Sequence, residues 1–300
     1  MYSFLSKGKR QFRRFIKSIL IKRRLKNGYY AIDIDTLNMG LGARIVNMLE
    51  ILLYCDTMAY VPVVKFNYKE KKNHTDYFKE LFYYKQLPAS VYENLKFTSI
   101  EDTSDLIWKN YHKRLRLDMA KSLFDKYLGF NQNILDEVDS FTSRFFADKQ
   151  ILGVHYRGTD KISEAPAVQF DNLIERIKKI VAKSTGVELI FVSTDDEKVL
   201  QNMAGSVFGV PVIFREDSIR SEDGTQIHLK EGNSKVVINH DAIVNCLILS
   251  RCHYLLKTAS FLSDCSVIFN PAIKVSVINA PYEYANWWPA SEMNEFALIN

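Results

Sequence analysis

The chain has 300 residues, of which 47% are hydrophobic and 25% are charged. This balance is typical of a soluble globular protein, and the length suits two domains of ordinary size or one large one. No stretch approaches the ~18 consecutive apolar residues of a membrane span. The four cysteines are scattered without metal or disulfide spacing, so we expect buried free thiols in a reducing compartment.

Charge is concentrated at the front of the chain. Residues 1–27 carry ten of the 40 Lys/Arg and none of the 35 Asp/Glu, so the remaining chain is mildly acidic, which argues against a nucleic-acid surface there. Apolar residues at helical spacing, from Phe12 to Leu20, are interrupted by basic ones. The pattern predicts a basic amphipathic helix that contacts an anionic membrane surface, not a cleavable signal. The alternatives are a solvated or self-packed helix and a nucleic-acid tail.

Strands and helices alternate through the first part of the chain. The predicted elements are a strand over Tyr29–Asp35, a turn through Gly40 and Gly42, a helix over Ala43–Cys55, a strand over Thr57–Val64, and helices over Asp118–Tyr127 and Gln132–Phe146. Residues 65–116 indicate short helices and long loops. No internal repeat is present.

A second alternating series starts at Ile151. It predicts strands over Ile151–Tyr156, Val187–Ser193, Val210–Phe214, Tyr254–Lys257 and Lys274–Ile278, with helices over Gln169–Lys183, Asp195–Ala204, Asn239–Cys252 and Ser260–Phe269. Such alternation is typical of a parallel sheet covered on both faces. We therefore predict an α/β protein with two Rossmann-like lobes, residues 28–150 and 151–279, and a segment 280–300 that returns to the first lobe. Ligands of such sheets bind at the carboxyl ends of the strands.

The run Gly153-Val154-His155-Tyr156-Arg157-Gly158-Thr159-Asp160-Lys161 closes the first strand of the second series. Charged residues are almost never buried without a partner, so this concentration at a strand end indicates a site. Arg157 can hold a diphosphate through two hydrogen bonds, and His155 can bond a ribose, a base or a phosphate. Glu164 follows closely and could act as a base. The alternative is an ion-pair cluster between domains.

Other strand ends add further candidates. Asp195 is placed to cap a helix, with Asp196 beside it. Ser260 opens a helix whose N-terminus could bind phosphate or which it simply caps. Asp241 and Asn245 are four residues apart and share one helix face. The six histidines have no ligand spacing, and Asp33-Ile34-Asp35 precedes the glycine turn with no supporting cluster, so we predict no metal site.

These motifs resemble those of the GDP-fucose fucosyltransferases, most closely the branch of α1,6-fucosyltransferases and nodulation fucosyltransferases. The resemblance rests on five runs in the family's order: Gly40–Arg44, Gly153–Lys161 followed by Glu164, Phe191–Asp196, Asp241–Cys252 and Leu255–Phe261. It implies a GT-B fold, two Rossmann-like lobes facing a cleft, in which the second lobe binds the donor and the first shapes the acceptor site.

The resemblance also implies roles for individual residues. The implied catalytic set is Arg157, Glu164, Asp160 and Lys161, and the implied donor-binding set is Gly40, Gly42, Arg44, His155, Asp195, Asp196, Asp241, Asn245, Ser260 and Phe261. Three departures leave alternatives open. Gly158 stands where the branch has a second arginine, and Ala43 stands where some relatives have a functional asparagine. The spacing from Lys161 to Glu164 is one residue short, so Asp160 is the alternative base. Asn245 aligns with the family's guanine-binding acid, with Asp241 one turn earlier.

The resemblance implies an inverting transfer of fucose from GDP-fucose, without metal or other cofactor, to a glycan or lipid-linked glycan. With the basic arm, it suggests a cytoplasmic enzyme peripheral to the inner membrane face in bacterial surface polysaccharide assembly. Two alternatives remain open. One is a transferase of this fold with another nucleotide sugar, and the other is a catalytically silent protein that binds GDP or a glycan.

Overall fold

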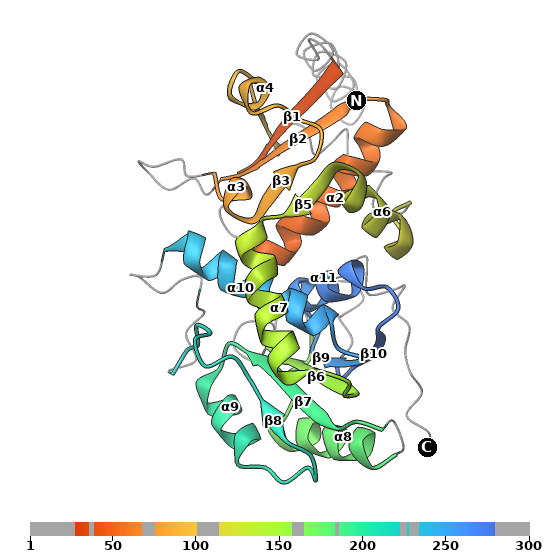
Figure 1. The fold of residues 1–300 in the computed structure, drawn as a ribbon, viewed down its shortest axis with the longest axis vertical. Coiled ribbons are helices and arrows are strands. Elements are labelled where there is room, and N and C mark those ends of the chain that lie inside the picture. The colour runs from red at the N-terminus through yellow and green to blue at the C-terminus, as the bar shows by residue number, and fades with distance from the viewer. Residues whose placement is uncertain are drawn as a thin grey trace, which may run out of the picture. The chain divides into compact units, whose positions relative to one another are not determined.

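The computed structural model describes residues 28–35, 39–67, 76–100, 114–157, 165–183, 186–222, 227 and 234–279. The chain forms two compact units (Figure 1). The first comprises Met1–Met39 and Arg44–Gly129, and the second comprises Gly40–Ala43 and Phe130–Asn300. The basic arm, residues 1–27, and the segment 280–300 lie outside the described residues.

The first unit is built on a small parallel sheet with strand order β2-β1-β4. Its elements are β1 (Tyr29–Ile34), α2 (Leu41–Thr57), β2 (Val61–Phe66), α3 (Phe78–Leu81), β3 (Phe82–Tyr84), α4 (Ala89–Glu93), β4 (Thr98–Ser99), α6 (Leu117–Tyr127) and β5 (Leu128–Phe130). The predicted strand, helix and strand of its first half are confirmed within a few residues. The short strands β3, β4 and β5 were not predicted.

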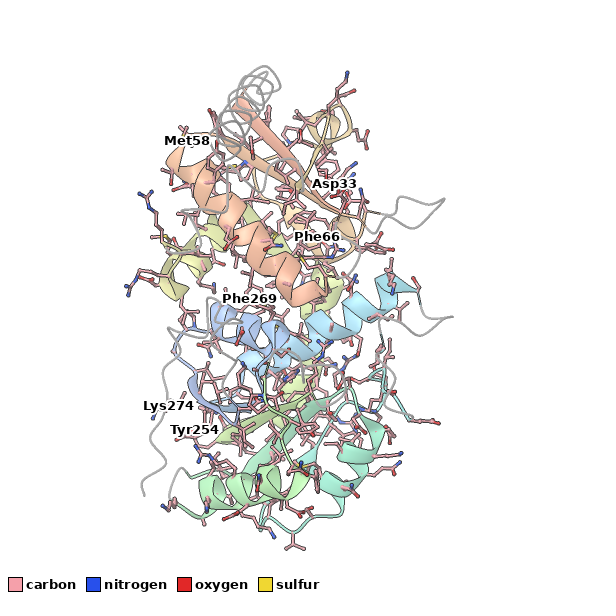
Figure 2. The ribbon with its side chains drawn as sticks, turned by 180° about the vertical axis from the view of Figure 1, so that it is seen from behind. Asp33, Met58, Phe66, Tyr254, Phe269 and Lys274 are labelled. Carbon is pink, nitrogen blue, oxygen red and sulfur yellow. The ribbon has the colours of Figure 1, made fainter. Side chains whose placement is uncertain are left out.

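Aromatic side chains fill much of the first unit's core. Phe66, at the end of β2 and labelled in Figure 2, meets Phe78 edge-on at 5.4 Å between ring centroids, and Phe82 at 6.1 Å. Phe124 of α6 packs on Phe82 at 5.8 Å. Such aromatic pairs bury large areas and favour tilted geometries. The segment that looked irregular in the sequence is therefore joined to the sheet by this cluster.

The second unit contains a five-stranded parallel sheet with order β10-β9-β6-β7-β8. Its strands are β6 (Ile151–Tyr156), β7 (Leu189–Thr194), β8 (Val212–Ile213), β9 (Tyr254–Lys257) and β10 (Lys274–Val277). Its helices are α7 (Gln132–Phe145), α8 (Phe170–Ala182), α9 (Glu197–Ala204), α10 (Lys235–Ser250) and α11 (Phe261–Phe269). At the open edge, Lys274 of β10 lies over the ring of Tyr254 of β9, 5.5 Å from its centroid (Figure 2).

Helices cover both faces of this sheet, as Figure 1 shows. Leu152 and Val154 of β6 point into a core with α8 and α9, whereas a Cβ on Gly153 would meet Leu249 of α10 and Cys252, which follows α10, on the other face. Because successive strand residues alternate between faces, His155 is on the α10 side. A strand buried on both faces reads as a continuous apolar run, which is why β6 was predicted at its observed bounds.

The division between the units falls before α7, earlier than the expected boundary near 149–150. The reason is that α7 packs along α10 and that Phe141 of α7 meets Phe191 of β7 at 5.4 Å. The first residues of α2 also belong by their contacts to the second unit.

Two predicted helix starts were wrong. The helix predicted from Asp195 begins at Glu197, and Asp196 is its N-cap, accepting from the N–H groups of Lys198 and Val199. Asp195 is therefore not the cap. The helix predicted from Asn239 begins at Lys235, one turn earlier, because Ser234 caps it by accepting from the N–H of Val236. A side-chain oxygen at this position satisfies an N–H that has no partner within the helix.

All four cysteines are free and buried, which confirms the expectation for their side chains. Of the helices in the described ranges, none combines the length and the apolar character that crossing a bilayer requires.

Candidate functional site

His155 is the next-to-last residue of β6, and its backbone oxygen accepts from the N–H of Thr258, the first residue after β9, at 3.0 Å. The histidine is 5% exposed, and its strand pairs with β9 so that His155 stands opposite Lys257. Burial, together with the charges of Lys257 and Arg157, lowers the pKa of His155 to about 3. The imidazole is therefore neutral at physiological pH. Its Nδ1 is buried and has no hydrogen-bond partner among the residues that the structure describes.

Arg157 follows β6 directly and sits between two neighbouring strand ends. Its backbone N–H donates to the hydroxyl of Thr258 after β9, at 3.0 Å. Its guanidinium Nε lies 3.8 Å from a carboxylate oxygen of Asp195 after β7, and both side chains are 22% exposed. The three residues are distant in sequence but adjacent at the carboxyl edge of the sheet, as the parallel topology requires. The partly exposed guanidinium can meet an anionic ligand.

Ser260 occupies the N-cap position of α11, yet its hydroxyl makes no capping hydrogen bond. The side chain is 1% exposed, and within the described ranges its oxygen has no partner. The interpretation of Ser260 as a simple cap is therefore not what the geometry shows. A helix N-terminus carries N–H groups without intrahelical partners and a partial positive charge, which suits a phosphate.

A buried ion pair that the sequence analysis missed supports this edge. The ammonium of Lys257 donates to Asp264 of α11 at 2.6 Å, and both side chains are 1% exposed. The pair joins the end of β9 to the first turns of the helix that Ser260 begins. A lysine in an apolar strand, followed by an aspartate in an apolar helix, was the available signal, because buried charges require partners.

Asp241 and Asn245 do lie together on α10, as the spacing predicted. Asn245 donates to Asp241 Oδ1 at 3.2 Å and to the hydroxyl of Ser218 at 2.9 Å. Asp241 also accepts from Arg215 at 2.7 Å and from the N–H of Ile219 at 3.2 Å. Burial raises the pKa of Asp241, while these hydrogen bonds and the charge of Arg215 oppose the rise. Both oxygens of Asp241 thus hold the loop that follows β8.

The predicted glycine turn separates into residues with different roles. A Cβ on Gly42 would lie 2.5 Å from backbone atoms of Phe261 and Leu262 in the first turn of α11, so only glycine fits. At Gly40 a Cβ would meet none of the described atoms within 4 Å. Arg44 is fully buried. Its guanidinium donates to the backbone oxygens of Ile34, Asn67 and Met39. Arg44 therefore holds the ends of β1 and β2 in the first unit.

Three predicted residues fall outside the described ranges, namely Asp160, Lys161 and Glu164. Asp33 and Asp35 do lie in the described ranges, and both accept hydrogen bonds: Asp33 from Asn67 and Asp35 from Ser99. In the described part of the chain, no group of three or more His, Cys, Asp or Glu side chains could hold a metal ion.

Comparison with known proteins was negative by sequence and positive by structure. A scan with models of protein families and a sequence search of curated proteins both found no match. Among solved structures, the α1,6-fucosyltransferase NodZ soaked with GDP-fucose matches with a TM-score of 0.56 and 13% identity, over 81% of this chain and 94% of that one. NodZ from Bradyrhizobium matches with a TM-score of 0.54 and 12% identity, over 79% and 93%. POFUT1 in complex with GDP-fucose matches with a TM-score of 0.51 and 11% identity, over 85% and 99%.

The chain has the fold of these fucosyltransferases. The fold class predicted from the sequence, α/β with parallel sheets of the GT-B type, is therefore confirmed. The arrangement of two lobes across a cleft stays a prediction.

Proposed function

We propose that this protein is a glycosyltransferase that moves fucose from GDP-fucose to a glycan hydroxyl group. The observation that carries the proposal is the edge of the second sheet, where Arg157, the neutral His155 and the start of α11 at Ser260 come together. A partly exposed guanidinium and a helix N-terminus, each following one of two neighbouring strands, suit a diphosphate. The fold shared with fucosyltransferases such as NodZ and POFUT1 supports fucose as the transferred group.

The proposed step is a single displacement with inversion at the anomeric carbon of fucose. The acceptor oxygen forms a bond to that carbon while the bond to the diphosphate oxygen breaks, and its electron pair leaves with GDP. Arg157, with the N-terminus of α11 and Lys161, stabilises the departing charge, which is usually the largest catalytic contribution. Glu164 takes the proton of the acceptor hydroxyl, and Asp160 is the alternative base. The step as proposed uses no metal.

The roles of the neighbouring acids follow from their contacts. Asp195 orients Arg157 through their ion pair, whereas Asp196 fixes the start of α9. Asp241 and Asn245 hold the loop after β8, and through this loop they recognise the guanine of GDP. Gly42 allows the start of α2 to approach the first turn of α11, where Phe261 lies, and Gly40 leaves room for the donor.

We further propose that the acceptor is a lipid-linked or surface glycan. In this setting the protein is cytoplasmic and residues 1–27 contact the inner face of the membrane, since basic residues are attracted to anionic headgroups. A second candidate function keeps the fold but uses another nucleotide sugar. Both carboxylate oxygens of Asp241 already accept hydrogen bonds from the protein, so this carboxylate is not available to bind guanine directly. This observation favours the second candidate.

The test is the variant Arg157→Ala, compared with Arg251→Ala. Arg251 is an exposed arginine of the same unit that pairs with Asp139 at 3.3 Å, so the control matches the lost charge. We expect Arg157→Ala to lower turnover of GDP-fucose by about 10²–10³-fold, as for other lost charge stabilisation in a transition state. Turnover should be unchanged in Arg251→Ala. Near-normal turnover in Arg157→Ala would contradict the assignment of the donor site.

A further inference from the structure

The first unit has a polar cluster that the donor site does not use. Asp33 lies near the carboxyl end of β1, the central strand, opposite Lys65 of β2 and Ser99 of β4 (Figure 2). Asn67 follows β2 directly and donates from Nδ2 to Asp33 Oδ2 at 2.6 Å. The carboxyl edge of a parallel sheet is where ligands of α/β proteins bind. This cluster therefore stands where the first unit's own ligand would be expected.

Two acceptor atoms in this cluster lack donors. Asp33 Oδ1 and Asn67 Oδ1 are both buried, and neither has a hydrogen-bond partner in the ranges that the structure covers. The Asn67 side chain is only 6% exposed, and its amide is turned toward Asp33. Leaving buried acceptors unpaired costs free energy that a donor from a ligand would recover.

The nearby polar groups already have their own contacts. Asp35 accepts from Ser99 at 2.7 Å. Asp76 accepts from the N–H of Phe78 at 3.1 Å and from the hydroxyl of Tyr92. Among the described residues, Asp33 Oδ1 and Asn67 Oδ1 are thus acceptors without matching donors.

The character of the cluster favours a neutral ligand that carries hydroxyl groups. Burial raises the pKa of Asp33 to about 6, an effect that Asp35 and Asp76 reinforce while the Asn67 hydrogen bond and Lys65 oppose it. The ammonium of Lys65 stands close by, 4.2 Å from the centroid of the Phe97 ring, and would repel a cation.

Two aromatic rings lie beside this cluster. Tyr92 and Phe97 pack against each other at 5.4 Å between centroids, next to Lys65. Tyr92 is only 5% exposed, and the ammonium groups of Lys79 and Lys65 lie over the Tyr92 and Phe97 rings at 4.1 and 4.2 Å from their centroids. The rings therefore offer no free face for a sugar, and it is the placed polar acceptors that would bind its hydroxyl groups.

We propose that Asp33 and Asn67 form a binding subsite for sugar hydroxyl groups in the first unit, which holds the acceptor glycan of the transfer reaction. The assignment to the acceptor rests on the proposed function. The binding of hydroxyl groups rests on the cluster alone. Asp33 Oδ1 and Asn67 Oδ1 each accept a hydrogen bond from the sugar, and Arg44 positions them by holding the backbone oxygens of Ile34 and Asn67.

The experiment uses the full chain and an array of immobilised neutral mono- and oligosaccharides, with GDP binding measured in parallel by calorimetry. The test variants are Asp33→Asn, which keeps the shape, and Asn67→Ala. Glu80→Gln is the control, because Glu80 is an exposed acid of the same unit. We expect wild type and Glu80→Gln to bind the same sugars, and each test variant to lose at least about tenfold in affinity, the value of one hydrogen bond. GDP affinity should stay unchanged in all of them.

A thermal unfolding scan separates a binding role from a structural one. The buried carboxylate of Asp33 is poorly solvated, so we expect Asp33→Asn to unfold at or above the wild-type temperature at pH 8. Sugar binding that is unchanged in both test variants, no sugar bound by the wild type, or loss of binding only together with a lower unfolding temperature would overturn the subsite. If GDP does not bind while sugar binding depends on Asp33, the proposed transfer is wrong and the subsite stands.

Discussion

The ion pair of Lys257 and Asp264 offers the sharpest test of how the second unit is held together. Lys257 Nζ lies 2.6 Å from Asp264 Oδ1, and both side chains are 1% exposed. Water therefore cannot solvate either charge if the other is removed. The perturbation is Lys257→Met, which keeps the length and apolar stem of the lysine and removes its charge. The matched changes are Asp264→Leu and the double variant that carries both.

The size of the effect follows from burial. Removing one partner of a buried pair leaves an uncompensated charge and costs about 3–5 kcal/mol, whereas replacing both by apolar residues is often neutral or stabilising. A loss of this size is a large part of the 5–15 kcal/mol that holds a typical domain folded. Lys257→Met should therefore be strongly destabilised, and the double variant should return close to wild type.

The assay is hydrogen exchange followed by mass spectrometry, because it reports each unit separately. Peptides that cover β6 and β9 should lose about 10²–10³-fold in protection in Lys257→Met, while peptides from β1 and β2 should not change. Protection equal to wild type in Lys257→Met, or a double variant as poorly protected as the single one, would refute the reasoning that this pair is buried and coupled.

Three further predictions concern stability. Burial and two neighbouring cations lower the pKa of His155 to about 3. The free energy of unfolding should therefore rise with pH between about 3 and 6.5, by up to about 5 kcal/mol. Urea titrations of His155→Asn should show a flatter rise. Burial raises the pKa of Glu50 to about 8, which has the opposite effect: the free energy of unfolding falls as pH rises from about 4.5 to 8. Glu50→Gln should be more stable than wild type at pH 9 and equal to it at pH 4. Gly42→Ala places a Cβ 2.5 Å from backbone atoms and should cost about 1–3 kcal/mol or more, whereas Gly40→Ala, which meets none of the described atoms, should unfold at the wild-type temperature in a melting experiment.

Much of the second unit could be predicted because its local signals agree with its tertiary structure. The run Ile151–Tyr156 is buried at every position, and its observed strand has those same ends. The turn from β9 into α11 was placed within one residue for a similar reason, since apolar runs on both sides are separated by Thr258-Ala259-Ser260. Parallel topology then brought the strand ends together without further information.

The errors occurred where distant contacts decide between adjacent residues. Asp195 and Asp196 are equivalent as local capping signals. In the structure, the backbone oxygen of Asp195 accepts from the N–H of Ser221 at 2.8 Å, which holds Asp195 in the extended chain and leaves Asp196 as the cap. A partner 26 residues along the chain gives no local signal, so the choice could not be made from the sequence.

The pairing of buried charges was equally out of reach. Lys257 could be recognised as unusual in its strand, but Asp264 as its partner depends on how α11 packs under β9. The same holds for Asn67 and Asp33, which are 34 residues apart and meet only because β1 and β2 pair in parallel register. Sequence motifs thus located the strand ends, and the fold determined which side chains meet there.

The most direct test of the account is nucleotide binding by calorimetry, with GDP and GDP-fucose compared with UDP, ADP and CMP, each with and without EDTA. We predict selective binding of GDP and GDP-fucose that EDTA does not change and that Arg157→Ala weakens. Tighter binding of another nucleotide would contradict the assignment of the donor, and the absence of binding to any of them would contradict the transferase proposal itself.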